Sequence, residues 1–207
     1  MTPEKKIESL NLVIPIGKPK ALGSYVPIVN VNDLVFISGQ LPIDINSPSN
    51  DLNFKGKVGK QISIEDAQLA CKICCLNAFS ILKSLIGDLD KVKRIVKITG
   101  YVNCDDAFTD HPKVINGASD FLIEVFGDLA RHSRVAVGVN SLPLNSPVEI
   151  DFIIQIQILP FHDVGQGLAG KIVNRAEAAL VHKSPEAGLH FPHDAEAVVH
   201  GSRAYLH

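Results

Sequence analysis

The sequence predicts an α+β fold, a two-layer sandwich in which a mixed β-sheet carries two helices on one face. Two segments, near 63–87 and 112–127, have apolar residues at helical spacing, and the segments around them alternate apolar and polar residues. The order is strand, strand, helix, strand, helix, strand, strand. We expect one domain over residues 1–158 and a loosely ordered C-terminal extension over residues 159–207.

The first two strands are expected to form a hairpin. Residues Val26–Val31 and Leu34–Ser38 flank the turn-forming pair Asn32-Asp33. The second strand ends in Ser38-Gly39-Gln40. Residues 42–61 are rich in Pro, Asn, Ser, Asp and Gly, which indicates a long loop, and a loop of this length in a compact domain is usually functional or mobile.

The first helix begins at Ser63, which forms a capping box with Asp66, and ends at Gly87. A strand follows, from about Ile95 to Asn103. The apolar stripe of this first helix predicts that the helix packs on the sheet. The stripe consists of Ala70, Cys74, Ala78, Ile81 and Leu85.

The second helix begins near Pro112 and ends at Gly127. Its stripe consists of Val114, Ala118, Phe121, Leu122 and Val125. Gly117 lies inside this helix, at a cost of about 1 kcal/mol relative to alanine. We expect another part of the chain to approach the helix backbone there, beside Asn116.

Residues 131–151 contain the strongest candidate site. We interpret them as two strands joined by a turn, with Val135, Val137 and Val139 on the apolar face of the first. If the two strands pair and share their apolar face, Arg134 and Glu149 lie together on the other face. Ala136 and Gly138 beside them would leave room for a small ligand. The alternative is a structural ion pair or two solvated charges.

Composition narrows the classes of function. The formal net charge is −2, with 46% hydrophobic and 20% charged residues, so charge gives no argument for nucleic-acid binding. No apolar run approaches the ~20 residues of a membrane helix, and the N-terminus does not resemble a secretory signal. We therefore expect a cytoplasmic protein that has no membrane association.

Cysteine and histidine patterns do not favour a metal site. Cys71, Cys74 and Cys75 have the spacing of core-facing helix residues, and no second cluster completes a zinc site. Six of the eight histidines follow residue 158, among them the segment HFPH at 190–193. These could bind a metal adventitiously, but we expect no functional metal and no cofactor.

Several motifs occur together in one order: GSYVP, FISGQLP, VINGASDFL and HSRVAVGV followed by LP and VEI. With them, residues 10–158 resemble the Rid family, also called YjgF-type or L-PSP endoribonuclease-like proteins. The resemblance implies a chorismate-mutase-like subunit and a homotrimer with three clefts between subunits. The archetype hydrolyses 2-imino acids to 2-keto acids and ammonia, which implies a small carboxylate or imine ligand.

The resemblance also implies site residues. Arg134 matches the arginine that binds the substrate carboxylate, with Gly39 and Ala136 beside it in the binding site. The remaining matches are the expected catalytic residues, namely Glu149, which orients water, Asn116, Ser38 and Tyr25. The alternative role for Ser38 and Tyr25 is plain packing and strand-end hydrogen bonding, and the alternative for Asn116 is a helix-end hydrogen bond.

Two positions depart from the archetype, which has cysteine at Ala136 and glutamate at Gly138. The smaller residues would enlarge and neutralise the pocket. They favour the alternative of a non-catalytic, carboxylate-binding or regulatory module. A further alternative is an endoribonuclease, although His132 is the only histidine near the expected cleft.

Overall fold

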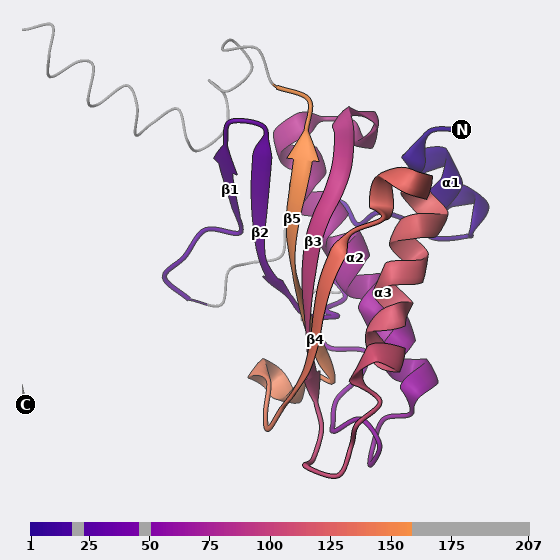
Figure 1. The fold of residues 1–207 in the computed structure, drawn as a ribbon, viewed down its shortest axis with the longest axis vertical. Coiled ribbons are helices and arrows are strands. Elements are labelled where there is room, and N and C mark those ends of the chain that lie inside the picture. The colour runs from indigo at the N-terminus through magenta and orange to yellow at the C-terminus, as the bar shows by residue number, and fades with distance from the viewer. Residues whose placement is uncertain (18–22, 46–50, 159–207) are drawn as a thin grey trace, which may run out of the picture. The chain divides into compact units, whose positions relative to one another are not determined.

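The structure is a computed structural model that describes residues 1–17, 23–45 and 51–158 (Figure 1). The C-terminal extension predicted after residue 158 lies outside the described residues. The helices and strands in chain order are α1 (Pro3–Ser9), β1 (Ile28–Val31), β2 (Leu34–Gln40), α2 (Ile64–Ile86), β3 (Val92–Asn103), α3 (His111–Phe126), β4 (Ser133–Val139) and β5 (Val148–Ile156). Short 3-10 turns precede β3, follow α3 (η2, Gly127–Ala130) and connect β4 to β5.

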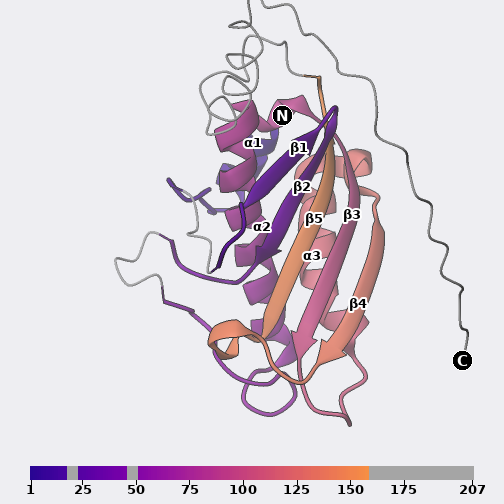
Figure 2. The ribbon, with the colours of Figure 1, turned by 90° about the vertical axis from the view of Figure 1, so that its left-hand side faces the viewer.

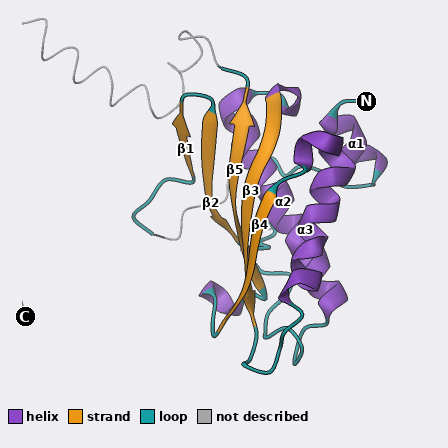
Figure 3. Cartoon of the chain, viewed as in Figure 1, coloured by secondary structure: helices purple, strands orange, loops and turns teal. Residues whose placement is uncertain are grey.

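The five strands form one mixed sheet in the order β1-β2-β5-β3-β4. All neighbouring strands are antiparallel except β3 and β4, which are parallel. Helices α2 and α3 lie on one face of this sheet, and no α-helix of the described chain covers the other face (Figures 2 and 3). The predicted α+β two-layer sandwich is therefore confirmed.

The predicted ends of α2 are confirmed. The Ser63 hydroxyl accepts a hydrogen bond from the Asp66 backbone N–H (3.0 Å), and Gly87 ends the helix with a φ of 81°. The length and composition of α2 would also allow a membrane span, although no such run was expected from the sequence. Of its most apolar window, 67% is buried inside the domain, which is typical of a core helix.

Close packing of the two long helices explains Gly117. A Cβ at this position would lie 2.5 Å from Cα of Gln68 in α2 and 2.6 Å from its carbonyl oxygen. The predicted close approach to the α3 backbone is thus made by α2. The cysteines Cys71, Cys74 and Cys75 are fully buried, as expected for core residues.

The expected hairpin of the last two strands is wrong. β4 pairs with β3 alone and forms an edge of the sheet, whereas β5 is inserted between β2 and β3. The register pairs Ile98 with Arg134 on β4 and with Phe152 on β5. Alternation within each strand predicts which residues share a face, but it does not determine which strands become neighbours.

The predicted common face of Arg134 and Glu149 is also wrong. Arg134 lies level with the buried residues Ile98 and Phe152 and faces the helices. Glu149 is paired with Tyr101 and lies on the open face of the sheet. The valines of β4 were assigned to the core, but Val135 and Val137 are each 40% exposed, on the open face. On this edge strand, the row of valines lies on the open face of the sheet and not on the face that packs against the helices.

One helix was not predicted. In α1, Thr2 caps the N-terminus by accepting a hydrogen bond from the Lys5 N–H (3.3 Å), and Pro3 occupies the first turn. The same pattern of a capping threonine followed by proline is visible in the sequence, but seven residues are too few to show a clear helical period.

Candidate functional site

Arg134 on β4 is held by the inner side of α3. Its Nη1 donates one hydrogen bond to Oδ1 of Asn116 (2.8 Å) and one to Oγ of Ser119 (3.0 Å). Asn116 and Ser119 are three residues apart on α3, a spacing that places both side chains on the same helix face. The resemblance pointed to Arg134 and Asn116, and the structure brings them together.

A histidine extends this network. Nδ1 of His132 lies 2.6 Å from the carbonyl oxygen of Ala130, and Nε2 lies 3.1 Å from Oγ of Ser119. Burial, opposed by the Ala130 carbonyl and assisted by the Arg134 charge, lowers the pKa of His132 below 6.5. The imidazole is therefore neutral at neutral pH.

Two of the three guanidinium nitrogens of Arg134 have N–H groups that remain available to a ligand. Both N–H groups of Nη1 are used by Asn116 and Ser119, whereas Nε and Nη2 donate to no residue in the described part of the chain. One N–H of Nη2 and the N–H of Nε are parallel and match the two oxygens of a carboxylate. Arg134, Asn116, Ser119 and His132 form what we call the arginine half-site.

Glu149 on β5 lies on the other face, against β2. A Cβ on Gly39 would overlap Oε1 of Glu149, so the carboxylate lies directly over a strand position without a side chain. Burial and the neighbouring charge of Asp151 raise the pKa of Glu149 above 4.5. A raised pKa suits a carboxylate that accepts a proton from water near neutral pH.

Ser38 precedes Gly39 on β2, and its side chain contacts the segment that follows Tyr25. The Ser38 hydroxyl donates to the carbonyl oxygen of Val26 (2.8 Å), which fixes the segment between Tyr25 and β1. This bond is the strand-end role that the sequence alone suggests for Ser38. Tyr25 is 50% exposed and packs its ring against Gly23. Tyr25, Ser38, Gly39 and Glu149 form what we call the glutamate half-site.

Within one chain, the two half-sites do not meet. Arg134 and Glu149 lie on opposite faces of the sheet, on strands separated by β3. Neighbouring strands are about 4.8 Å apart, so the two strands are roughly 10 Å apart before the difference in face is added. No single small ligand can contact both residues of the same subunit.

The cavity expected beside Ala136 and Gly138 is already occupied. A Cβ on Gly138 would overlap Nε2 of His111 and lie 2.8 Å from Sγ of Cys104. These two groups contact each other at 3.4 Å, and burial raises the pKa of the Cys104 thiol. Ala136 packs against the hydrophobic core. The small residues of β4 therefore accommodate protein side chains and do not enlarge a pocket.

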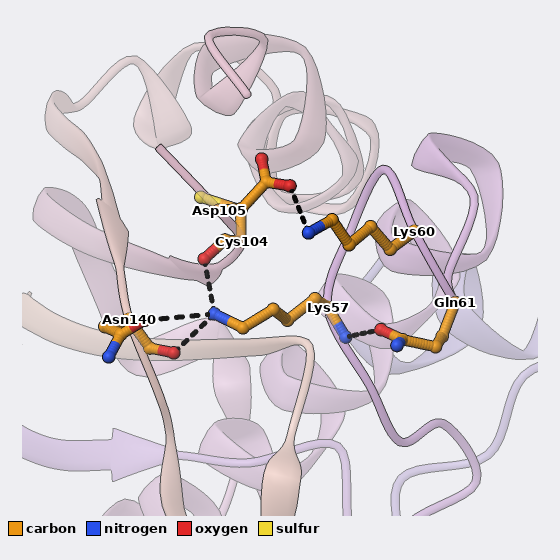
Figure 4. Close-up of polar contacts among 6 residues, drawn as sticks. All are labelled: Lys57, Lys60, Gln61, Cys104, Asp105 and Asn140. Carbon is orange, nitrogen blue, oxygen red and sulfur yellow. Dashed lines mark hydrogen bonds and ion pairs between the residues drawn. The ribbon is translucent and has the colours of Figure 1, made fainter. Parts of the chain in front are cut away.

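The loop before α2 forms hydrogen bonds with the residues that follow β3 and β4 (Figure 4). Nζ of Lys57 donates to the carbonyl oxygens of Cys104 (2.6 Å) and Asn140 (2.5 Å), which follow β3 and β4. Lys60 forms an ion pair with Asp105 (2.7 Å). The loop that the sequence marked as functional thus joins the ends of the two parallel strands.

The sequence analysis did not identify Ser119, and it noted His132 only as a histidine near the cleft and not as part of the arginine site. Ser119 lies in the NGASD motif, three residues after Asn116, and His132 lies two residues before Arg134. Helical spacing from Asn116 and strand spacing from Arg134 could have identified both positions. Neither spacing reveals that α3 and β4 meet there.

The fold defines the class of protein: an α+β subunit of the chorismate-mutase-like type. Residues 7–155 match the family model described as "YjgF/chorismate mutase-like, putative endoribonuclease". The chain therefore belongs to the YjgF-type family, also called the Rid family.

Relatives support this assignment over most of their own lengths. Protein TCP17 of Trypanosoma cruzi is 35% identical over 72% of this chain and 91% of its own length. The RutC family protein y4sK of Sinorhizobium fredii is 30% identical, over 67% and 91% respectively. The crystal structure of Atu1372 from Agrobacterium tumefaciens, a protein of unknown function, is 36% identical with a TM-score of 0.68, over 75% and 94%.

Proposed function

We propose that this protein hydrolyses small 2-imino acids to 2-keto acids and ammonia. The observation that carries the proposal is the state of Arg134, whose Nη1 is fixed by Asn116 and Ser119 while its Nε and Nη2 keep parallel donors. A planar fork of this kind is suited to a carboxylate. The carboxylate is the group that all 2-imino acids share.

The division of the site supports a homotrimer with clefts between subunits. Arg134 and Glu149 can act on one ligand only if they come from different copies of the chain. The open sheet face next to Glu149 carries partly exposed apolar side chains that a neighbouring copy would cover. These include Val29, Val31, Phe36, Val135 and Val137.

The proposed reaction needs water and no cofactor. Arg134 holds the ligand carboxylate, and Glu149 of another copy accepts a proton from a water molecule as the oxygen bonds to the imine carbon. The carbon–nitrogen π bond opens, and the nitrogen takes this proton from Glu149. Transfer of the remaining hydroxyl proton and cleavage of the carbon–nitrogen bond then release ammonia and the 2-keto acid. Glu149 returns to its carboxylate form.

A second candidate is a module that binds a small carboxylate without turning it over. The arginine half-site, with its hydrogen bonds, is built within one chain, whereas Glu149 depends on assembly to approach the ligand. This arrangement favours binding over catalysis if the subunits do not bring Glu149 into register.

The endoribonuclease alternative has less support from the residues. His132 contacts Ala130 and Ser119 through its two ring nitrogens, and His111 is packed against Cys104 and Phe108. Neither histidine is available as one of a pair of acid and base groups.

For location we propose the cytoplasm, where Cys71, Cys74, Cys75 and Cys104 would stay reduced, as they are here.

A coupled assay tests the proposal. An amino-acid oxidase generates the imine, semicarbazide traps it, and the protein competes by forming the 2-keto acid. We expect faster keto-acid formation with wild type and the background rate with Glu149→Gln. Carboxylate binding without acceleration for any amino acid of a broad panel would establish the binding module instead. Cleavage of single-stranded RNA by wild type, abolished in Glu149→Gln, would favour the nuclease.

A further inference from the structure

The hydrogen bonds around Arg134 have defined directions. The Ala130 carbonyl can only accept, so Nδ1 of His132 carries the proton that lies between them (2.6 Å). The neutral ring then has a lone pair on Nε2, which accepts the hydroxyl proton of Ser119 (3.1 Å). With its proton directed to His132, Oγ of Ser119 presents a lone pair to Nη1 of Arg134 (3.0 Å).

This relay determines the orientation of the guanidinium. Asn116 alone would leave the group free to rotate about one hydrogen bond, whereas acceptors on both N–H groups of Nη1 fix its plane. Among the described residues, the charged group that acts on His132 is Arg134 of β4. The other polar groups that contact His132 are neutral oxygens, the Ser119 hydroxyl of α3 and the Ala130 carbonyl of η2. The neutral imidazole accepts a proton and does not add a second positive charge.

We infer that Ser119 and His132 are positioning residues, which hold the Arg134 guanidinium so that its Nε and Nη2 donors are presented to the ligand carboxylate. The inference rests on the proposed carboxylate binding. It adds that affinity depends on two side chains that need not touch the ligand. A purely structural role, in which the same bonds only fasten α3 to β4, would change stability and not affinity.

Four variants separate these roles in the full-length protein. Ser119→Ala removes the acceptor for Arg134, and Ser119→Thr keeps the hydroxyl. His132→Phe removes the acceptor for Ser119, and His132→Gln keeps one in its amide oxygen. Ser84→Ala in α2 is the matched control, because the Ser84 hydroxyl donates within its own helix, to the Ile81 carbonyl (2.6 Å).

Calorimetry with 2-ketobutyrate and benzoate, and thermal unfolding of the same samples, provide the readouts. We expect Ser119→Ala and His132→Phe to weaken binding by about fivefold, the effect of one hydrogen bond. Ser119→Thr and His132→Gln should restore most of the affinity, and Ser84→Ala should bind as wild type does. In an Arg134→Lys background the effect of Ser119→Ala should vanish, because an ammonium group has no plane to fix.

Nitrogen NMR of the unliganded protein gives a second measurement. Wild type should show His132 with its proton on Nδ1 and slowed rotation of the Arg134 guanidinium, and Ser119→Ala should lose the slowed rotation. Equal affinity of Ser119→Ala and wild type, or an equal loss in the Arg134→Lys background, would overturn the inference while carboxylate binding stands. Wild type that binds neither carboxylate would overturn the proposed ligand together with the inference. If Ser119→Ala does not fold, His132→Phe and His132→Gln provide the same comparison.

Discussion

The two half-sites are built in different ways. The arginine half-site lies between α3 and an edge strand, and its hydrogen bonds are made within one chain. The glutamate half-site lies on an open sheet face, where burial raises the pKa of both Glu149 and Asp151 and no basic side chain of the described chain forms an ion pair with either. One half is organised within a single chain, and the other is expected to depend on the proposed assembly.

This difference suggests separate roles for the two half-sites in ligand binding and in proton transfer. A cation whose neighbours are fixed in advance loses little freedom on binding an anion. A carboxylate whose pKa is raised by burial accepts a proton from water more readily than a freely solvated one does. We expect binding to depend on the arginine half-site and turnover to depend on both.

The largest effect is expected from preventing assembly. Phe36 is 40% exposed on the open sheet face, and Phe36→Asp would place a charge where we propose another copy packs. We expect a monomer by light scattering and no detectable turnover, with the helical circular dichroism retained. Leu69→Asp on α2, at a residue 49% exposed, is the control and should remain a trimer. An active Phe36→Asp monomer would show that the half-sites do not need to meet.

Mixing two inactive variants tests whether the half-sites come from different subunits. Arg134→Ala and Glu149→Gln should each be inactive as pure trimers. Refolded together in equal amounts, they should recover about a quarter of the wild-type rate, because a cleft works when each variant contributes its intact half in a head-to-tail ring. No recovery, with mixed trimers verified by mass spectrometry, would place both residues in one subunit's site.

Binding alone should depend on the arginine half-site. Arg134→Ala should weaken 2-ketobutyrate, pyruvate or benzoate by at least about tenfold, since a paired charge is lost. Arg134→Lys should recover only part of the affinity, because the planar fork is missing. Calorimetry measures all three proteins. Glu149→Gln should bind these ligands almost as wild type does, and an equal loss in both variants would remove the distinction between the half-sites.

A smaller and more local effect is expected at Gly39. A Cβ at this position would overlap Oε1 of Glu149, so Gly39→Ala should displace the carboxylate. We expect kcat to fall by about tenfold while carboxylate affinity is retained, because a displaced proton acceptor loses part of the roughly 100-fold or larger contribution of general base catalysis. Unchanged kcat in Gly39→Ala would argue against Glu149 as the base.

The smallest effect concerns the acidic character of the open face. Burial raises the pKa of Asp151 above 3.8, so the folded state binds its proton more tightly than the unfolded chain does. As pH rises from 3.8 through the higher pKa of the folded state, Asp151 loses its proton and the free energy of unfolding decreases. The decrease is still present at neutral pH. Asp151→Asn should increase the free energy of unfolding at pH 7 by less than about 1 kcal/mol, and not below pH 3.8. Denaturant melts at both pH values measure it, with Asp120→Asn on α3 as the control.

The sequence predicted most of the fold because most of its signals are local. The Ser63 cap, the Gly87 stop and the Asn32 turn each depend on neighbouring residues, and all three are found where expected. Gly117 also predicts a close approach to the helix backbone, and α2 makes that approach. Local signals of this kind require no knowledge of which strands are neighbours.

The site was predicted in part, and the error has a physical origin. Arg134 and Asn116 were expected in one site, and they form a hydrogen bond. Arg134 and Glu149 were expected on one face because their strands are adjacent in sequence. In the structure β3 separates those strands, and β4 presents its valines to the open face. Strand order depends on long-range pairing, which alternation within a strand does not encode.

The position of β5 has a consequence for how the chain folds. β5 is the last strand of the sheet in sequence, yet it lies between β2 and β3 and bonds to both. Until residues 148–156 are in place, the β1–β2 hairpin and the β3–β4 pair are separate pieces, each with an unpaired inner edge. Such edges are open to pairing with other chains. The period of synthesis before β5 emerges is therefore when this protein is most exposed to aggregation, and closing the sheet is a late, long-range step.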